Sequence, residues 1–540
     1  MSRLYRRYRH PTASILAVFL LFACLFRVSA ASVSSGSDEG DWLVYRLSAE
    51  PATLNPITAT DVYEATVNSF IYESLLERDN RTLELVPLLA ESWEVSPDRM
   101  SYIFTLRPGL TWQDGRSLTS RDVVFTFGLM NDPSVDAPHL KSYFRDLVEV
   151  EALDERTIRF YFSTPYFNSL GMVGGVKILP EHVFRGGDFN SLPAVRQPLG
   201  SGPFRFIRWD TGRQIVLDRN DRYWRGKPHL RRIVFKIIAN ETVALQVLKK
   251  GELDYMELSP MQWVRQTGSL NFKKNFGKYD YYSPSYSFIG WNNRKIYFSD
   301  RRVRRAMTML LDRDSILKNL RYGLGRIVTG DFFHMSGGYN REVEPWPYDP
   351  SGAASLLDEA GWRDSDGDGV RDREGIAFRF ELTIPADALF AEQVATILQE
   401  NLRKVGVEMT IRPREWALFT RILDDRVFEA VIMAWNLPVE ADPFQVWHSS
   451  QTDKGSNFVG FVHAEADRII EEARTTFDRS RRIFLYRRFH RILHEEQPYT
   501  FLFSNKTLVA LAKRFHNVAI YPLGLNPKDW YVPDDLQKYQ

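Results

Sequence analysis

The residues with the clearest potential for binding chemistry lie in the stretch AWNLPVEADPF, residues 434–444. Trp435 ends the apolar run VIMAW, and Glu440 and Asp442 follow it in a loop that contains two prolines. The β-branched residues of that run predict a strand, so Trp435 is expected at the end of a strand. A crevice can begin at such a point, which makes this stretch a candidate ligand site.

The elements around this stretch are predicted to form a parallel α/β unit with right-handed crossovers. The strands are residues 377–384, 407–411 and 428–435, and the helices are residues 390–405 and 417–423. Ligands of open α/β sheets bind beyond the carboxyl ends of the strands, so Trp416 and Trp435 are expected at one crevice. The alternative for each tryptophan is an ordinary core or surface position.

The composition is typical of a globular protein with more than one domain. The chain has 540 residues, of which 44% are hydrophobic and 26% charged, and this length indicates two or three domains. Lys and Arg number 70 against 68 Asp and Glu, a balance that argues against binding to nucleic-acid phosphates. The sequence contains no GxSxG, GxxxxGK or GxGxxG motif, which lowers the expectation of an enzyme.

The N-terminus has the pattern of an export signal. An arginine-rich head precedes the apolar stretch 15–26, which is too short to span a bilayer. Residues 1–30 are the predicted signal peptide, and residues 31–41 have the composition of a tether. Two processing routes are open: a lipid on Cys24 of the lipobox-like LFAC, or cleavage after Val28-Ser-Ala30. Cys24 is the only cysteine, so the exported body has no disulfide and no cysteine metal site.

Several segments, in order along the chain, carry a resemblance to one known family. They are residues 87–127, 200–238, 248–258, 287–317, 348–362 and 494–503. The first, PLLAESWEVSPDRMSYIFTLRPGLTWQDGRSLTSRDVVFTF, closely resembles the signature region of the family 5 extracellular solute-binding proteins. These include the dipeptide- and oligopeptide-binding receptors of ABC importers. Several ordered matches over most of the chain are strong evidence, whereas one would be weak.

The resemblance implies a two-lobed α/β fold of the periplasmic-binding-protein type, in its large three-subdomain form. Lobe I would comprise residues 42–285 and 498–540, with an inserted subdomain at about 82–199, and lobe II residues 286–497. Two strands would cross between the lobes as a hinge. The implied protein is a monomeric receptor outside a bacterial cytoplasmic membrane, which closes on a solute and delivers it to an ABC permease.

Short peptides are the solute that this resemblance favours, and the receptor role requires no cofactor. Oligosaccharides, nickel complexes and opines, which other members of the family bind, are the alternative ligands. A hypothesis of a different class is an exported enzyme or chaperone on the same scaffold. Another is a ligand-loaded sensor that docks onto a membrane receptor.

The resemblance also identifies candidate ligand-binding residues. In peptide-binding members, the tryptophans of an EW pair and of a strand end line the pocket, and here they match Trp416 and Trp435. An aspartate three residues beyond the second tryptophan pairs there with the peptide's α-ammonium group, but this chain has Pro438, which cannot neutralise a charge. The predicted pocket residues are Trp416, Met433, Trp435 and Asn436, with Glu440 and Asp442 as replacement anchors and Asn292 near the hinge. Solvated loop positions are the alternative for both carboxylates.

An aspartate-rich stretch could bind calcium. Its carboxylates reproduce the start of a calcium loop, but Gly375 lies where the loop's final glutamate belongs. The candidate ligands are Asp364, Asp366, Asp368 and Asp372. The alternative is an Asp/Gly hairpin held by bonds from side chains to the backbone.

His490 and His494 have the i,i+4 spacing that can bind zinc on one helical face. The following HEEQP lacks the second histidine of a zincin motif. We expect a surface helix with an apolar stripe and both histidines near the boundary of the core.

Overall fold

A computed structural model describes residues 39–386 and 388–539. The predicted signal peptide, Cys24 and most of the tether lie outside these residues. Within the described residues, no helix has both the length and the apolar character needed to cross a membrane.

The first lobe is built on an eight-stranded sheet around β1 (Trp42–Leu47), the strand that opens the described chain. β1 pairs in parallel with β10 (Arg232–Ile237) and β11 (Tyr255–Glu257). The other strands of this sheet are β8 (Phe204–Asp210), β9 (Gln214–Arg219), β12 (Phe276–Tyr282), β14 (Gly325–Ile327) and β21 (Phe503–Ala512). Leu43 and Leu47 of β1 are buried in the main hydrophobic core of this lobe.

A separate four-stranded sheet is formed by residues 90–162, between β1 and β8 of the first sheet in the sequence. Its strand order is β4 (Ala90–Val95), β5 (Ser101–Leu106), β7 (Thr157–Phe162) and β6 (Leu147–Ala152). Phe104 and Phe160 are fully buried on one face of β5 and β7, with ring centroids 5.6 Å apart in an edge-to-face arrangement, which suits aromatic rings in a core. The chain then continues into α4 (Ser169–Gly175).

The second lobe is built on a five-stranded sheet. Its order is β18 (Glu408–Arg414), β17 (Arg379–Pro385), β19 (Ala430–Asn436), β13 (Ser285–Trp291) and β20 (Tyr499–Phe501). β17 pairs in parallel with both β18 and β19, and α11 (Leu389–Arg403) and α12 (Trp416–Asp424) connect these strands. The predicted parallel α/β unit is therefore confirmed, with element ends shifted by up to three residues.

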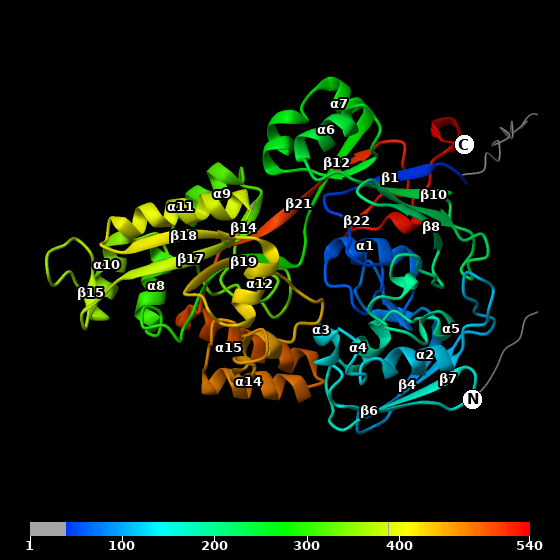
Figure 1. Ribbon diagram of the computed structural model, residues 1–540, viewed down its shortest axis with the longest axis horizontal. Coiled ribbons are helices and arrows are strands. Elements are labelled where there is room, and N and C mark those ends of the chain that lie inside the picture. Colours follow the sequence, from blue (N-terminus) through cyan, green and yellow to red (C-terminus); the bar gives the residue numbers. More distant parts are fainter. Residues whose placement is uncertain (1–38, 387, 540) are drawn as a thin grey trace, which may run out of the picture. The chain divides into compact units, whose positions relative to one another are not determined.

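The chain passes twice between the two large sheets. β12 leads into β13 after two residues, and β20 leads into β21 after one, and each pair has one strand in each sheet. In Figure 1, β21 runs from the region of the second sheet toward β12. These two connections form the two-strand hinge that the resemblance implied, so the predicted two-lobed fold is confirmed. The numerical lobe boundaries stay predictions.

Helices cover these sheets and complete both lobes. The helices of the first lobe are α1 (Val62–Ile71), α2 (Ser120–Gly128), α3 (Pro138–Lys141), α5 (Glu181–Phe184), α6 (Glu241–Lys249) and α7 (Leu270–Asn275). Those of the second are α8 (Arg301–Met309), α9 (Arg313–Leu320), α10 (Pro350–Glu359), α13 (Phe444–Trp447), α14 (Ala464–Thr475) and α15 (Arg479–Glu496). Short hairpins are formed by β2 (Leu76–Arg78) with β3 (Leu85–Pro87), β15 (Asp372–Arg373) with β16 (Ile376–Ala377), and β22 (Ile520–Tyr521) with β23 (Gly524–Leu525).

Candidate functional site

A cavity of about 520 Å³ lies between segments of the two lobes, a size that suits a small ligand. The second lobe contributes the loop after β19, residues 437–441, together with Asp331 and Arg482. The first lobe contributes Arg78 and Phe167 among other residues. The stretch that the sequence marked as a ligand site thus forms part of a cavity wall.

The two predicted replacement anchors have different surroundings. Glu440 lines the cavity with a side chain 32% exposed, and its carboxylate lies 3.7 Å from Arg482 Nη2. The Asp442 side chain is only 5% exposed, lies 3.2 Å from Arg474 Nε and accepts a 2.8 Å hydrogen bond from Tyr166 Oη. Asp442 therefore already has a cationic partner and a donor inside the protein, whereas Glu440 still faces the cavity.

The predicted aromatic pocket residues do not contribute to the wall of this cavity. Trp435 is half-buried and stacks on Phe458 at 6.0 Å, and its Nε1 lies 3.4 Å from Tyr499 Oη. Trp416 begins α12, is 59% exposed and stacks on Phe419 at 5.6 Å. Their roles in ligand binding stay predictions.

The two remaining pocket candidates on β19 differ in exposure. Met433 is half-buried and packs against the hydrophobic cluster of the second lobe, whereas Asn436 is exposed. Asn436 is paired in the sheet with Ser285 of β13, immediately before the loop that forms the cavity wall. A role for either side chain in ligand binding also stays a prediction.

Asp331 is a cavity residue that the sequence analysis missed. It is only 7% exposed, lines the 520 Å³ cavity, and accepts a 2.5 Å hydrogen bond from Tyr286 Oη. Burial raises the pKa of this carboxyl group to about 7, although the Tyr286 hydroxyl favours the charged form. The surrounding sequence, TGDFFHM, has no spacing that distinguishes this aspartate from other loop aspartates.

Comparison with known proteins identifies the scaffold around this cavity. The profile described as bacterial extracellular solute-binding proteins, family 5 Middle, matches residues 84–457, more than half of the chain. The chain belongs to this family. The resemblance drawn from the sequence segments is therefore confirmed.

Relatives of this family 5 protein cover nearly its whole length. The oligopeptide-binding protein AppA of Bacillus subtilis is 28% identical over 97% of this chain and 99% of its own. Its structure with a nonapeptide matches with a TM-score of 0.82 over 92% of this chain and 99% of that chain. The dipeptide-binding protein of Escherichia coli is 26% identical over 92% and 95%. NikZ of Campylobacter jejuni, in complex with Ni(L-His), is 25% identical with a TM-score of 0.79 over 92% and 99%.

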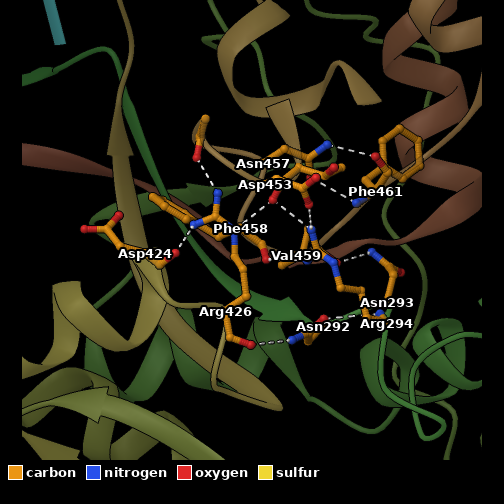
Figure 2. Close-up of polar contacts among 12 residues, drawn as sticks. Asn292, Asn293, Arg294, Asp424, Arg426, Asp453, Asn457, Phe458, Val459 and Phe461 are labelled. Atoms are coloured by element: carbon orange, nitrogen blue, oxygen red, sulfur yellow. Dashed lines mark hydrogen bonds and ion pairs between the residues drawn. The ribbon is translucent and has the colours of Figure 1, made fainter. Parts of the chain in front are cut away.

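Asn292, predicted near the hinge, is buried in this family 5 protein and is hydrogen-bonded to the backbone. Its side chain is fully buried and donates to the backbone carbonyls of Phe428, at 2.8 Å, and Arg426, at 3.4 Å. Figure 2 shows it beside Arg294, which bonds to the Phe458 carbonyl at 3.2 Å. Both amide hydrogens of Asn292 are therefore directed at the backbone, and a role for Asn292 in ligand binding stays a prediction.

The aspartate-rich stretch forms a turn before the β15–β16 hairpin. One carboxylate oxygen from each of Asp364, Asp366 and Asp368 lies within 4.8 Å of the other two, and all three residues are exposed. Asp364 accepts from the backbone amides of Gly367 and Gly369, whereas Asp372 accepts from Ser365. These bonds are those of the hairpin alternative, and calcium binding stays a prediction.

Of the two histidines of α15, only His490 lies deeper than expected, whereas His494 is half-buried, near the boundary of the core as predicted. His490 is fully buried rather than near the core boundary, because α15 packs against the segment after β14. Its Nδ1 accepts from the backbone amide of Asn340 at 3.1 Å, and its Nε2 lies 2.8 Å from Thr329 Oγ1. Burial lowers its pKa to about 3. Both ring nitrogens have protein partners, so His490 offers no free atom to zinc.

Proposed function

We propose that this protein is the receptor of an ABC importer for short peptides, which it binds between its lobes and hands unchanged to a membrane permease. The observation that carries the proposal is the cavity between the lobes of a family 5 solute-binding protein. Its relatives include proteins named for oligopeptide and dipeptide binding. A hinge-closing receptor gains its closed state from contacts that both lobes make to the ligand.

The cavity wall supports backbone recognition of an extended peptide. The loop 437–441 passes along the cavity, and the backbone amides of Val439 and Glu440 donate no hydrogen bond to any described residue. Free amides beside a cavity can pair with an extended chain, which binds peptides without regard to side chains. Such pairing does not depend on an aspartate at position 438.

In this proposal, residues other than Pro438 bind the charged groups of the ligand. Glu440 faces the cavity and is the replacement anchor for a peptide ammonium group that we propose. Asp331 lines the same cavity from another segment of the second lobe. Arg78, whose side chain donates to the Leu83 carbonyl at 2.7 Å, is a basic group on the first-lobe side.

We further propose that the protein is exported through the signal peptide at residues 1–30, acts as a monomer and catalyses no reaction. Export places the cavity where external solutes enter. Anchoring through a lipid on Cys24 and release as a soluble protein are both consistent with this function.

Native mass spectrometry of the purified exported form, before and after denaturation, tests the ligand class. We expect a heterogeneous set of short peptides to be released. Release of a single sugar, metal complex or opine would contradict peptide binding but would leave the receptor role intact. Conversion of added peptides to products would contradict the receptor role itself.

A further inference from the structure

The first lobe contains a second, larger cavity of about 950 Å³. Its wall includes parts of α1 and β11, the segment 223–229 and the C-terminal segment 523–529. Acidic and basic side chains both face it. The acidic residues are Glu73, Glu77, Asp79, Glu257 and Asp529, and the basic residues are Arg78, Lys177, Arg225, Lys227 and Lys528.

Most of the basic groups in this wall have acidic or backbone partners. Arg225 Nη1 lies 2.5 Å from Glu77 Oε1, and Lys227 Nζ lies 2.6 Å from Glu39 Oε2. Glu73 is engaged by neutral donors: it accepts from Tyr223 Oη at 2.7 Å and from Trp224 Nε1 at 3.1 Å. Glu73 and Glu77 are therefore held by other groups. The carboxylates of Glu257 and Asp529 also line this cavity and form no hydrogen bond or ion pair with any described residue.

Lys177 and Lys528 are the exceptions. Neither ammonium group forms a hydrogen bond or an ion pair with any described residue, although both side chains line the cavity. Burial and the neighbouring positive charge of Lys528 together lower the pKa of Lys177 to about 8, against the opposing effect of Glu73 and Glu77. Burial also lowers the pKa of Lys528, against the opposing effect of Glu77, Glu73 and Asp529. Two like charges without direct partners in a partly buried wall are costly unless a ligand neutralises them.

We infer that Lys177 and Lys528 form a binding site for an oxyanion, a carboxylate or a phosphate, in the first-lobe cavity. Lysine donates from a compact charged group and suits such anions. This cavity shares Arg78 and Leu523 with the cavity between the lobes. The acidic group of a long ligand held between the lobes can therefore reach it, and a free anion can also occupy it. The inference rests on the proposed function only where the anion belongs to a peptide.

Calorimetric titration of the unliganded exported form tests this site with inorganic phosphate, with succinate, and with peptide pairs that differ only in a C-terminal carboxylate or amide. The variants are Lys177→Gln and Lys528→Gln. The matched control is Lys227→Gln, a lysine in the wall of the same cavity that already pairs with Glu39. We expect the wild type to bind at least one of the two free anions, or to prefer the peptide acid over the amide, and either Lys→Gln variant to weaken that binding at least tenfold. Lys227→Gln should bind as the wild type does.

The outcomes separate the source of the anion from the existence of the site. Binding of phosphate or succinate with no peptide binding would support the site and contradict the peptide receptor. An acid-over-amide preference that both variants lose would assign the site to the ligand's own carboxylate. Equal binding by the wild type and both variants, or no anion binding and no acid preference in the wild type, would overturn the inference.

Folding of the variants is not expected to limit this experiment. Replacing an unpaired, partly buried ammonium group by a neutral side chain removes a desolvation cost. Lys177→Met and Lys528→Met should therefore be at least as thermally stable as the wild type in the absence of ligand. They provide a second pair of variants for the same titrations.

Discussion

Tyr166 donates a 2.8 Å hydrogen bond to the Asp442 carboxylate. Tyr166 follows β7 of the four-stranded sheet and Asp442 follows β19 of the five-stranded sheet, so this bond joins the first lobe to the second. Arg474 of α14 lies 3.2 Å from the same carboxylate, and its backbone carbonyl accepts from the Phe167 amide at 2.9 Å. The contact is therefore a small network that holds the lobes in the arrangement of this structure.

Substitution of Tyr166 by Phe should weaken solute binding. A hydrogen bond to a charged group contributes about 1.5–3 kcal/mol, so loss of this bond disfavours the arrangement in which both lobes contact the ligand. We expect the dissociation constant of the released solute to rise about ten- to a hundredfold, as measured by calorimetry. Tyr161→Phe, at a tyrosine that is 39% exposed on β7, is the matched control. Unchanged affinity in Tyr166→Phe would show that the bond does not contribute to closure.

Substitution of Pro438 by Asp should increase the preference for peptides with a free amino terminus. Pro438 is exposed and lines the cavity, so an aspartate there can face the ligand and pair with its ammonium group. We expect binding of a free peptide to become up to about fivefold tighter relative to its N-acetylated form, since an ion pair at an exposed position contributes about 0.2–1 kcal/mol. Calorimetry with both peptides measures this ratio.

Pro438→Asn is the control for this substitution, because it removes the same proline without adding a charge. Loss of the proline alone should lower stability in both variants by about 0.4–1 kcal/mol through the unfolded chain. An equal ratio of affinities in Pro438→Asp and Pro438→Asn would place the ligand's amino terminus elsewhere, for example beside Glu440.

Sequence periodicity could predict the second lobe because its core strands and helices are amphipathic or apolar throughout. Val394, Leu398 and Leu402 recur at helical spacing and are all fully buried, so the pattern reflects the packing directly. The same reasoning could not find Asp331, because burial of a lone loop carboxylate depends on segments distant in sequence, such as Tyr286 of β13. Glu440 and Asp442 both lie close to Trp435 in the sequence. For the same reason, the sequence could not show that Asp442 pairs with Arg474, whereas Glu440 lines the cavity.

Removal of calcium should leave the stability of the protein unchanged. Asp364 and Asp372 use their oxygens for bonds to nearby backbone and serine groups, and Gly375 supplies no final carboxylate. On the hairpin alternative, we expect the melting temperature to shift by less than about 1 °C between 5 mM CaCl2 and 5 mM EDTA, because an ion without a binding site adds no stability. A rise of several degrees with calcium that Asp366→Asn abolishes would instead establish the calcium loop.

Substitution of Asp331 by Asn should change how stability depends on pH. The pKa of Asp331 is about 7 in the folded protein and about 3.9 in an unfolded chain. Between these values the folded state binds the additional proton, so the contribution of Asp331 to stability falls as the pH rises from about 4 to 7. Asp331→Asn removes this titration. We expect the variant to gain stability relative to the wild type between pH 5 and pH 8, by at most about 1.4 kcal/mol per pH unit.

Thermal unfolding of the unliganded protein at pH 5, 6, 7 and 8 measures this difference. Asp453→Asn, whose carboxylate is 92% exposed, is the control, and its melting curve should follow that of the wild type at every pH. A constant difference between Asp331→Asn and the wild type across this range would show that Asp331 stays ionised, with its charge compensated by water in the cavity. A difference that grows with pH would instead identify an uncompensated carboxylate facing the ligand cavity, where a cationic group of the solute would relieve the same cost on binding.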